Sequence, residues 1–284
     1  FLLNSMNPAI FNADDTFLVW SEWQKKFFET EFEIRAPMVV SGHPRFDIYK
    51  RLPHEKKSYD YLINTSFSYP NHVQGLDFIF SEKNPSYNFD KNKDFIYSNY
   101  FSQRGAQSWL EKIVFVLSSK HPNSKIVIRP HPSENEQYYA TLFKPLKNVE
   151  VFSDELIEEA LAKTKVLIQV GCTTAIESYI AQIPTYTNRN FSSSRAEVAS
   201  DLSIHLDIDS IDLSMSGGLM VDNDKISVHS FQVLANLTES FDSSKVVRDV
   251  LTDHLNKMRQ VSQFRIFSSL FFSLVVYFIV YWPV

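Results

Sequence analysis

Two short segments of the chain combine residue types that bind phosphate. The first, Arg129-Pro130-His131-Pro132, follows the apolar run 126–128, which is typical of a buried strand. The prolines end a strand and stiffen the chain, a guanidinium binds phosphate through forked hydrogen bonds, and an imidazole adds one more donor. The pattern therefore predicts a phosphate site at Arg129 and His131. The alternative is a structural turn, in which His131 caps a neighbour and Arg129 pairs with a surface acid.

The second segment, Gly-Cys-Thr-Thr at 171–174, joins another apolar run to a stretch with helical character. A glycine lets the backbone approach a ligand closely, and the free N–H groups at a helix start attract an anion. We expect Gly171, Thr173 and Thr174 to contact a phosphate, and Glu177, about one turn further on, to hold ribose hydroxyls. The alternative is an ordinary threonine N-cap with Glu177 in its capping box.

A third group of small polar side chains, with Asn64 and Ser66 among them, lies at the end of the strand-like segment 59–64. These side chains could reach a phosphate or a second substrate, or they could form Asx and ST turns. Upstream of them, we expect Arg45 to form an ion pair with Asp47 or a neighbour and so to fix a domain junction.

Composition and missing motifs narrow the function classes. With 284 residues the chain is long enough for one large or two ordinary domains, and its net charge of -5 gives no basic field that would draw it to nucleic acid. The sequence has no Walker A lysine motif, no GxGxxG and no GxSxG, which argues against P-loop NTPases, dehydrogenases and α/β-hydrolases. The single cysteine, Cys172, has no partner at zinc-like spacing, so we expect no metal ion.

The elements that must position these residues alternate along the chain. Alternation of strands with helices of about ten residues predicts parallel pairing in a doubly wound, Rossmann-like α/β sheet, whose ligands bind at the carboxyl ends of the strands. Both loops named first lie at such ends. The expected strands are 59–64, 125–129, 149–152, 166–170 and 185–187, and the expected helices are 103–119, 134–143, 154–163, 174–181 and 241–258. The stretches 66–100 and 201–212 are interpreted as connections.

The two ends of the chain differ in character. Residues 1–57 look like the tail of a preceding α/β domain and its linker, and we expect further sequence before Phe1. Residues 58–260 form the predicted nucleotide-binding domain. In the last segment, 264–284, a run of 19 residues from Ile266 onward carries no charge and would span about 28 Å as a helix, close to the thickness of a bilayer core. We expect it to associate with a membrane; a buried or interfacial helix is the alternative.

With these motifs in view, the chain resembles bacterial surface carbohydrate biosynthesis proteins, which are GT-B-like enzymes related to capsule polysaccharide glycosyltransferases. The resemblance implies two Rossmann-like domains, of which this chain supplies the C-terminal, donor-binding one and only the last elements of the N-terminal one. In similar enzymes a His-Pro motif, matched here by His131-Pro132, contacts the donor phosphate, and a hydroxyl-rich turn, matched by Thr173 and Thr174, completes the site. The Glu177 position is similar to one that binds ribose in the UDP-N-acetylglucosamine 2-epimerase group. The segments that carry the resemblance are 17–20, 42–47, 62–68, 126–132 and 171–184.

The function that this resemblance implies is transfer of a sugar from a nucleotide donor, CMP-linked by preference and otherwise UDP-linked, to a glycan or lipid-linked acceptor. His131 and Arg129 would then be the catalytic groups, no cofactor is expected, and the site would lie on the cytoplasmic side of the inner membrane. Three alternatives stay open: a UDP-N-acetylglucosamine 2-epimerase-like enzyme, a CDP-glycerol glycerophosphotransferase-like enzyme, and a non-catalytic membrane-tethered scaffold.

Overall fold

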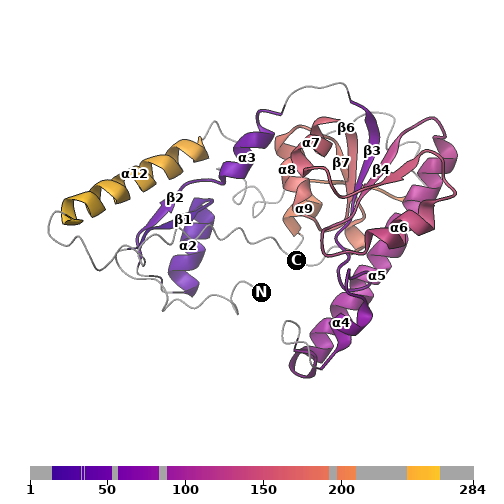
Figure 1. Ribbon diagram of the computed structural model, residues 1–284, viewed down its shortest axis with the longest axis horizontal. Coiled ribbons are helices and arrows are strands. Elements are labelled where there is room, and N and C mark those ends of the chain that lie inside the picture. The colour runs from indigo at the N-terminus through magenta and orange to yellow at the C-terminus, as the bar shows by residue number, and fades with distance from the viewer. Residues whose placement is uncertain are drawn as a thin grey trace. The chain divides into compact units, whose positions relative to one another are not determined.

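A computed structural model describes residues 15–262 except 33, 35, 53–56, 83–87, 192–196 and 209–241 (Figure 1). The described residues form two compact units. The smaller unit contains the residues up to Lys50 together with helix α12 (Ser243–Ser262), and the larger one contains the described residues from Arg51 to 208. All of the predicted site residues belong to the larger unit.

The larger unit is built on a six-stranded sheet in which every strand pair is parallel. The strand order is β5-β4-β3-β6-β7-β8, so β3 lies in the middle, the chain first proceeds outward to β5, and it then returns to the other side of β3. This is the order of a doubly wound Rossmann-like sheet, and the return from β5 to β6 makes the β3–β4 and β3–β6 neighbourhood its switch point. The strands are β3 (Tyr59–Asn64), β4 (Ile126–Arg129), β5 (Val149–Val151), β6 (Thr164–Gln169), β7 (Thr185–Thr187) and β8 (Ile204–His205). The predicted α/β sheet is confirmed.

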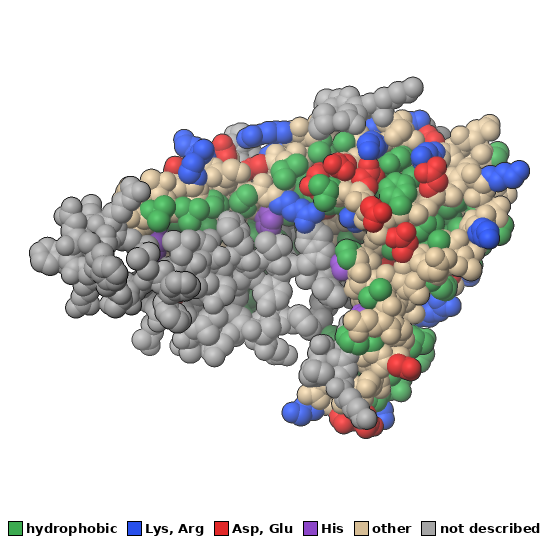
Figure 2. Space-filling model, viewed as in Figure 1, with side chains coloured by type: hydrophobic (Ala, Val, Ile, Leu, Met, Phe, Trp, Pro, Cys, Tyr) green, Lys and Arg blue, Asp and Glu red, His purple; other side chains and the backbone are tan. Residues whose placement is uncertain are grey.

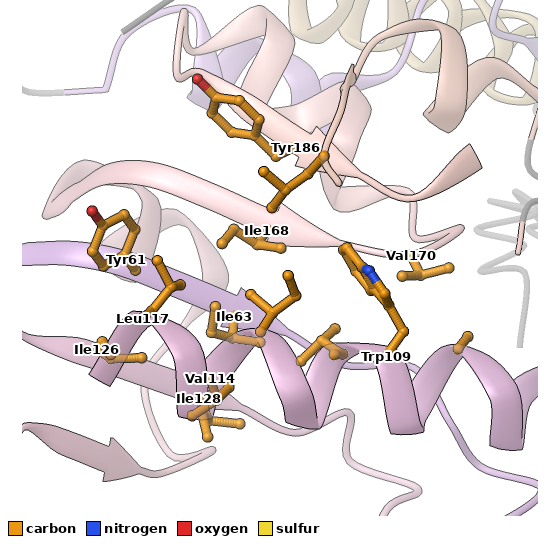
Figure 3. Packing of buried hydrophobic residues seen from close by; sticks show 14 of the residues in the cluster. Tyr61, Ile63, Trp109, Val114, Leu117, Ile126, Ile128, Ile168, Val170 and Tyr186 are labelled. Atoms are coloured by element: carbon orange, nitrogen blue, oxygen red, sulfur yellow. The ribbon is translucent and has the colours of Figure 1, made fainter. Parts of the chain in front are cut away.

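Helices cover both faces of this sheet (Figure 1). On one face, α5 (Phe89–Lys120) and α6 (Glu136–Phe143) pack on alternate residues of the strands, because successive strand side chains point to opposite faces. Figure 3 shows Trp109, Val114 and Leu117 of α5 directed at the strands of this face. On the other face lie α7 (Ile157–Ala162), α8 (Thr174–Ile180) and α9 (Glu197–Asp201).

The longest helix begins earlier than the sequence predicts. We expected a helix over 103–119 and a connection over 66–100, but α5 starts at Phe89, with one non-helical residue at Asn92, and a further short helix, α4 (Leu76–Phe80), precedes it. Aromatic contacts explain the difference: Phe80 of α4 packs edge-on against one tyrosine of α5 and tilted against another. Tertiary packing of aromatic residues thus makes helical a segment whose polar and aromatic composition resembles a loop.

The last strand was also missed. Residues 201–212 were interpreted as loop, yet Ile204 and His205 form β8 beside β7, with α9 just before it. Two residues are too few for an alternating pattern to be visible in a sequence. The pairing is completed by a hydrogen bond from Leu206 N to Thr187 O, at 2.8 Å.

The smaller unit has a two-stranded parallel sheet of β1 (Phe17–Val19) and β2 (Met38–Val40), connected by α2 (Glu22–Glu31). A short helix, α3 (Pro44–Tyr49), follows β2. We expected Arg45 to form an ion pair with Asp47 or a neighbour; the structure pairs Asp47 with Lys50, and Arg45 Nε donates to the Tyr49 hydroxyl at 3.1 Å.

Helix α12 packs with this smaller unit, whereas we placed its residues in the domain 58–260. Both the backbone N–H and the hydroxyl of Ser244 donate to Asp47 Oδ2, at 3.1 and 3.4 Å, so a buried carboxylate of α3 caps the first turn of α12. This contact joins residues that are 197 apart along the chain, and no local sequence pattern reports it.

No helix within the described part of the chain is long and apolar enough to cross a membrane. The predicted hydrophobic helix 264–284 lies outside the described residues, and its association with a membrane stays a prediction. On the face shown in Figure 2, acidic and basic side chains of the described residues are interspersed, without a large area of one sign.

Candidate functional site

The strand register puts three polar residues side by side at the carboxyl end of the sheet. Asn64 of β3 pairs in register with Arg129 of β4 on one side and with Gln169 of β6 on the other. In each strand the residue before this polar row is an isoleucine in the apolar core under α5. By alternation, the row belongs to the face covered by α7, α8 and α9. The polar row therefore lies at the switch point, where ligands of doubly wound sheets bind.

The polar row is joined to the 171–174 loop by hydrogen bonds. Asn64 Nδ2 donates to Thr174 Oγ1 at 3.1 Å and to Cys172 Sγ at 3.3 Å. Gln169 Oε1 accepts from the backbone N–H of Cys172 at 2.7 Å. On the other side, Arg129 Nη1 approaches Asn64 Oδ1 at 3.5 Å. Two loops that are distant in sequence are thus connected through one amide side chain.

Arg129 is half-buried and held along its length. Its Nε donates to the main-chain oxygen of Glu155 at 3.2 Å, which leaves the guanidinium at the carboxyl end of β4. The carboxylate of Glu155 accepts from Lys163 and from the Tyr59 hydroxyl. Glu155 therefore orients Arg129 through its backbone, and fixed orientation is what a forked donor to phosphate needs.

His131 lies in a tight turn that decides which ring nitrogen carries the proton. The backbone N–H of Ser133 donates to His131 Nδ1 at 3.2 Å, and the Ser133 hydroxyl lies 2.7 Å from the same nitrogen. Because Nδ1 accepts, a neutral ring carries its proton on Nε2. Burial, and secondly the charge of Arg129, lower the pKa of His131 below 6.5. At neutral pH this residue is an uncharged donor through Nε2–H.

The alternative expected for His131, a structural turn capped by its side chain, involves only the Nδ1 atom. Nδ1 caps the turn, as an ordinary turn histidine would. Within the described part of the chain, no hydrogen bond to Nε2 is formed, and the side chain is only half-buried. The geometry is compatible with a turn that also presents a donor.

The 171–174 loop is built differently. Gly171 has a φ of 65°, a left-handed conformation that favours glycine. The loop enters α8 through Thr173, whose side chain makes no capping hydrogen bond, so the capping-box alternative with Glu177 is wrong. The Thr174 hydroxyl is directed at Asn64. Burial raises the pKa of the Cys172 thiol, which keeps this cysteine protonated and unreactive.

Burial divides the eight predicted site residues into two groups. Three are almost inaccessible: Asn64 is 4% exposed, Thr174 2% and Glu177 1%. The other five are partly exposed, and these are Ser66, Arg129, His131, Gly171 and Thr173. Asn64 and Thr174 of the first group join two loops by a hydrogen bond, and the residues of the second group keep part of their surface exposed. A contact between Glu177 and ribose would require the chain around this carboxylate to open.

Two polar residues of this region were not predicted as site residues. Gln169 ends a strand that we read as wholly apolar, and it bonds Cys172 N and the Ser203 hydroxyl. Glu134 was interpreted only as the start of a helix, yet it is buried and bonds three different segments. A polar residue at the end of a buried strand is a signal that could have found Gln169. Within the described residues, no group of acidic, histidine or cysteine side chains is arranged to hold a metal ion.

Comparison with known proteins gives distant structural likeness only. No family model matches the chain, and no curated protein sequence matches it significantly. Among solved structures, the UDP-GlcNAc 2-epimerase of Methanocaldococcus jannaschii, in complex with UDP-GlcNAc and UDP, is similar at a TM-score of 0.47 and 15% identity, over 83% of this chain and 60% of that one. The wall teichoic acid polymerase TagF is similar at a TM-score of 0.45 and 12% identity, over 86% of this chain and 57% of that one. TarM is similar at a TM-score of 0.39 and 12% identity, over 84% of this chain and 43% of that one.

The chain therefore spans between 43% and 60% of the length of these three structures. At such identities and scores we take from them neither family nor function. The six-stranded parallel sheet is established by the strand pairing itself. The assignment to the GT-B group and the roles of the site residues stay predictions.

Proposed function

We propose that this chain binds the nucleotide donor of a glycosyltransferase that acts in surface polysaccharide biosynthesis. The donor is a nucleotide sugar, with a CMP-linked sugar favoured, and the acceptor is a glycan. The observation that carries the proposal is the polar row at the switch point, where a half-buried guanidinium and a neutral imidazole donor end one strand. The motif resemblance described from the sequence supports the choice of reaction.

The chemistry follows from where charge develops. When the bond between the sugar and the phosphate oxygen breaks, negative charge accumulates on the departing nucleotide phosphate. The Arg129 guanidinium and the Nε2–H of His131 would donate to that phosphate, and their interaction strengthens as the charge grows, which is the condition for lowering a barrier. A neutral histidine contributes a donor here, and Arg129 alone supplies the charge.

The remaining residues have supporting roles in this proposal. Gly171 and Thr173, half-buried at the neighbouring loop, and Ser66 after β3 would complete the contacts to the phosphate or the sugar. Asn64 and Thr174 hold the two loops in register. The acceptor, the position at a cytoplasmic membrane face and the group that activates the acceptor belong to the proposal for the whole enzyme.

Calorimetric titration of the chain with CMP, UDP and CDP tests this function. We expect binding by the wild-type chain, and a loss of at least about tenfold in affinity for Arg129→Ala, because charge-assisted hydrogen bonds contribute roughly 1.5–3 kcal/mol. Lys165→Ala is the matched control. It removes a cation that pairs with Asp60 at the amino end of β6, and its affinity should stay within about twofold of wild type.

The outcomes separate the proposed function from its rivals. Equal affinities of the two variants would place the nucleotide elsewhere and refute this site. A clear preference for UDP, with formation of the manno isomer from UDP-N-acetylglucosamine, would favour the 2-epimerase. Absence of binding for all three nucleotides at millimolar concentration would favour the scaffold.

A further inference from the structure

One buried acid has no part in the phosphate contacts proposed above. Glu134, at the end of the His131 turn, is 4% exposed. Its Oε1 accepts from the Thr65 hydroxyl at 2.9 Å and from the backbone N–H of His131 at 3.1 Å, and its Oε2 accepts from the Tyr139 hydroxyl at 2.6 Å. The donors come from three places: the loop after β3, the turn after β4, and helix α6. A buried carboxylate with this many donors has its geometry fixed from several sides.

The backbone of Glu134 and of its neighbours connects the loop after β3 with the turn after β4. Its N–H donates to the carbonyl of His131 at 2.8 Å, and the residue forms an antiparallel bridge with His72. On either side of it, Val73 N donates to Ser133 O at 2.8 Å, and Asn135 N donates to Asn71 O at 2.9 Å. Both main-chain polar groups of His131 are therefore bonded to Glu134, one through the carboxylate and one through the backbone.

This arrangement determines the direction of the His131 ring. Ser133 can donate to Nδ1 only while the turn from His131 to Glu134 keeps its shape, and the carboxylate of Glu134 holds the first residue of that turn. Without this acceptor, the partly buried N–H of His131 would lose its partner, which is costly enough to reshape a turn. The ring would then no longer be fixed as a donor through Nε2.

The electrostatics agree with an acceptor that bonds several donors at once. Burial raises the pKa of Glu134, and its hydrogen bonds, with that from Tyr139 the largest, act in the opposite direction. Burial, and then the charge of Glu134, raise the pKa of Tyr139, so this tyrosine keeps its proton and remains a donor. The charge of Arg129, the last residue of β4, acts on the His131 ring and lowers its pKa.

We propose that Glu134 is a positioning residue for His131: it holds the turn so that the imidazole presents Nε2–H at the carboxyl end of the sheet. The importance of this for catalysis rests on the proposed function. The positioning itself does not, because the protonated nitrogen of His131 can be observed without any ligand.

Nitrogen NMR of the histidine rings in the full chain tests the proposal. The His131 signals, assigned with His131→Gln, should show Nδ1 as an acceptor and Nε2 as protonated in the wild-type protein at neutral pH. Glu134→Met removes the acceptor at nearly the same side-chain length. It should lower the Nε2–H share of His131 from nearly complete to that of a solvated imidazole, in which Nδ1–H is also populated. It should also move the titration midpoint up toward 6.5, since a loosened ring becomes solvated.

Two further variants separate positioning from a merely structural role. Glu134→Gln can keep an amide oxygen toward His131 N and turn its NH₂ toward the Tyr139 hydroxyl, so it should restore the wild-type ring signals. Phe143→Leu, which opens the same core from α6 without touching Glu134, should lower stability and leave the His131 signals unchanged. If Glu134→Met does not fold, Glu134→Asp, which withdraws the carboxylate by one methylene, should shift the His131 signals in the same direction.

Unchanged His131 signals in the folded Met or Asp variant would overturn the proposal, and so would an equal change in Phe143→Leu. Titration with inorganic pyrophosphate adds a second readout: Glu134→Met should bind it roughly tenfold more weakly, and Glu134→Gln about as well as wild type. If wild type binds no pyrophosphate and no nucleotide, the proposed function fails. The ring signals still decide whether Glu134 positions His131.

Discussion

The loops after β4 and after β6 differ in what their polar side chains do, although both resemble anion sites in the sequence. After β4, Arg129 and His131 are half-buried, and the hydrogen bonds to Arg129 Nε and His131 Nδ1 hold both side chains at the carboxyl end of the strand. After β6, Cys172 and Thr174 turn inward and bond Asn64. One loop presents donors, and the other braces the sheet. A motif rich in donors is thus evidence for a binding surface only when its side chains stay partly exposed.

The largest expected effect concerns the presenting loop. His131→Ala should lower donor turnover by about 10²-fold or more, the usual cost of removing one preorganised donor from a developing anion. Its urea midpoint should change little, since the ring is half-buried. Turnover is measured by consumption of the nucleotide sugar, and unchanged turnover would remove His131 from the mechanism.

The hydrogen bond between Asn64 of β3 and the bracing loop should respond in the opposite way, with an effect on stability. Asn64→Leu conserves volume but leaves the buried Thr174 hydroxyl without its amide donor and removes the oxygen that lies near Arg129 Nη1. We expect the free energy of unfolding to fall by about 2 kcal/mol, from urea denaturation. Ser66→Ala, half-buried at the same strand end, is the control and should cost less than about 0.5 kcal/mol. Equal losses in the two variants would show that the Asn64–Thr174 hydrogen bond does not brace the loop after β6.

The reactivity of Cys172 sharpens the contrast further. Because the thiol is buried and burial raises its pKa, alkylation by iodoacetamide at pH 8 should be slow in the wild-type protein. Asn64→Leu should accelerate it roughly tenfold by easing local opening of the loop. His131→Ala should not, since it changes the other loop. Acceleration by both variants would mean that the two loops open as one unit.

The smallest effect is a pH dependence of stability from His131. Its pKa is lowered in the folded protein by burial and by Arg129, so the unfolded chain binds more protons between that pKa and 6.5. The contribution of the neutral His131 ring to stability is complete above about pH 6.5, and it is lost as the pH falls through the pKa of the folded state. The difference in unfolding free energy between wild type and His131→Gln should shrink over this range, and other histidines cancel in the difference. A difference independent of pH would show that the ring is solvated.

Much of the sheet was predictable because long alternating elements leave a pattern. Both ends of β3 and β7 were predicted to the residue. The end of β4 was also predicted correctly, and its start was predicted one residue too early. The aromatic first half of α5 and the two-residue β8 were missed, since packing between distant segments creates both. For the site, the sequence indicated which strand ends carry donors. It could not indicate that Thr174 faces inward or that Glu134 holds His131, because both follow from strand register and from bonds across the fold.

The strand order also has a consequence for how the site comes into existence during folding. Strands β4 and β5 join β3 from the nearer part of the chain, but the partner on its other side is β6, where Lys165 and Asp60 meet across 105 residues. Pairing over such a separation is entropically expensive and slow. Asn64 acquires Thr174 only in that step. A folding intermediate that contains β3, β4 and β5 would therefore contain Arg129 and His131 before Asn64 has bonded Thr174. Nucleotide affinity would appear last.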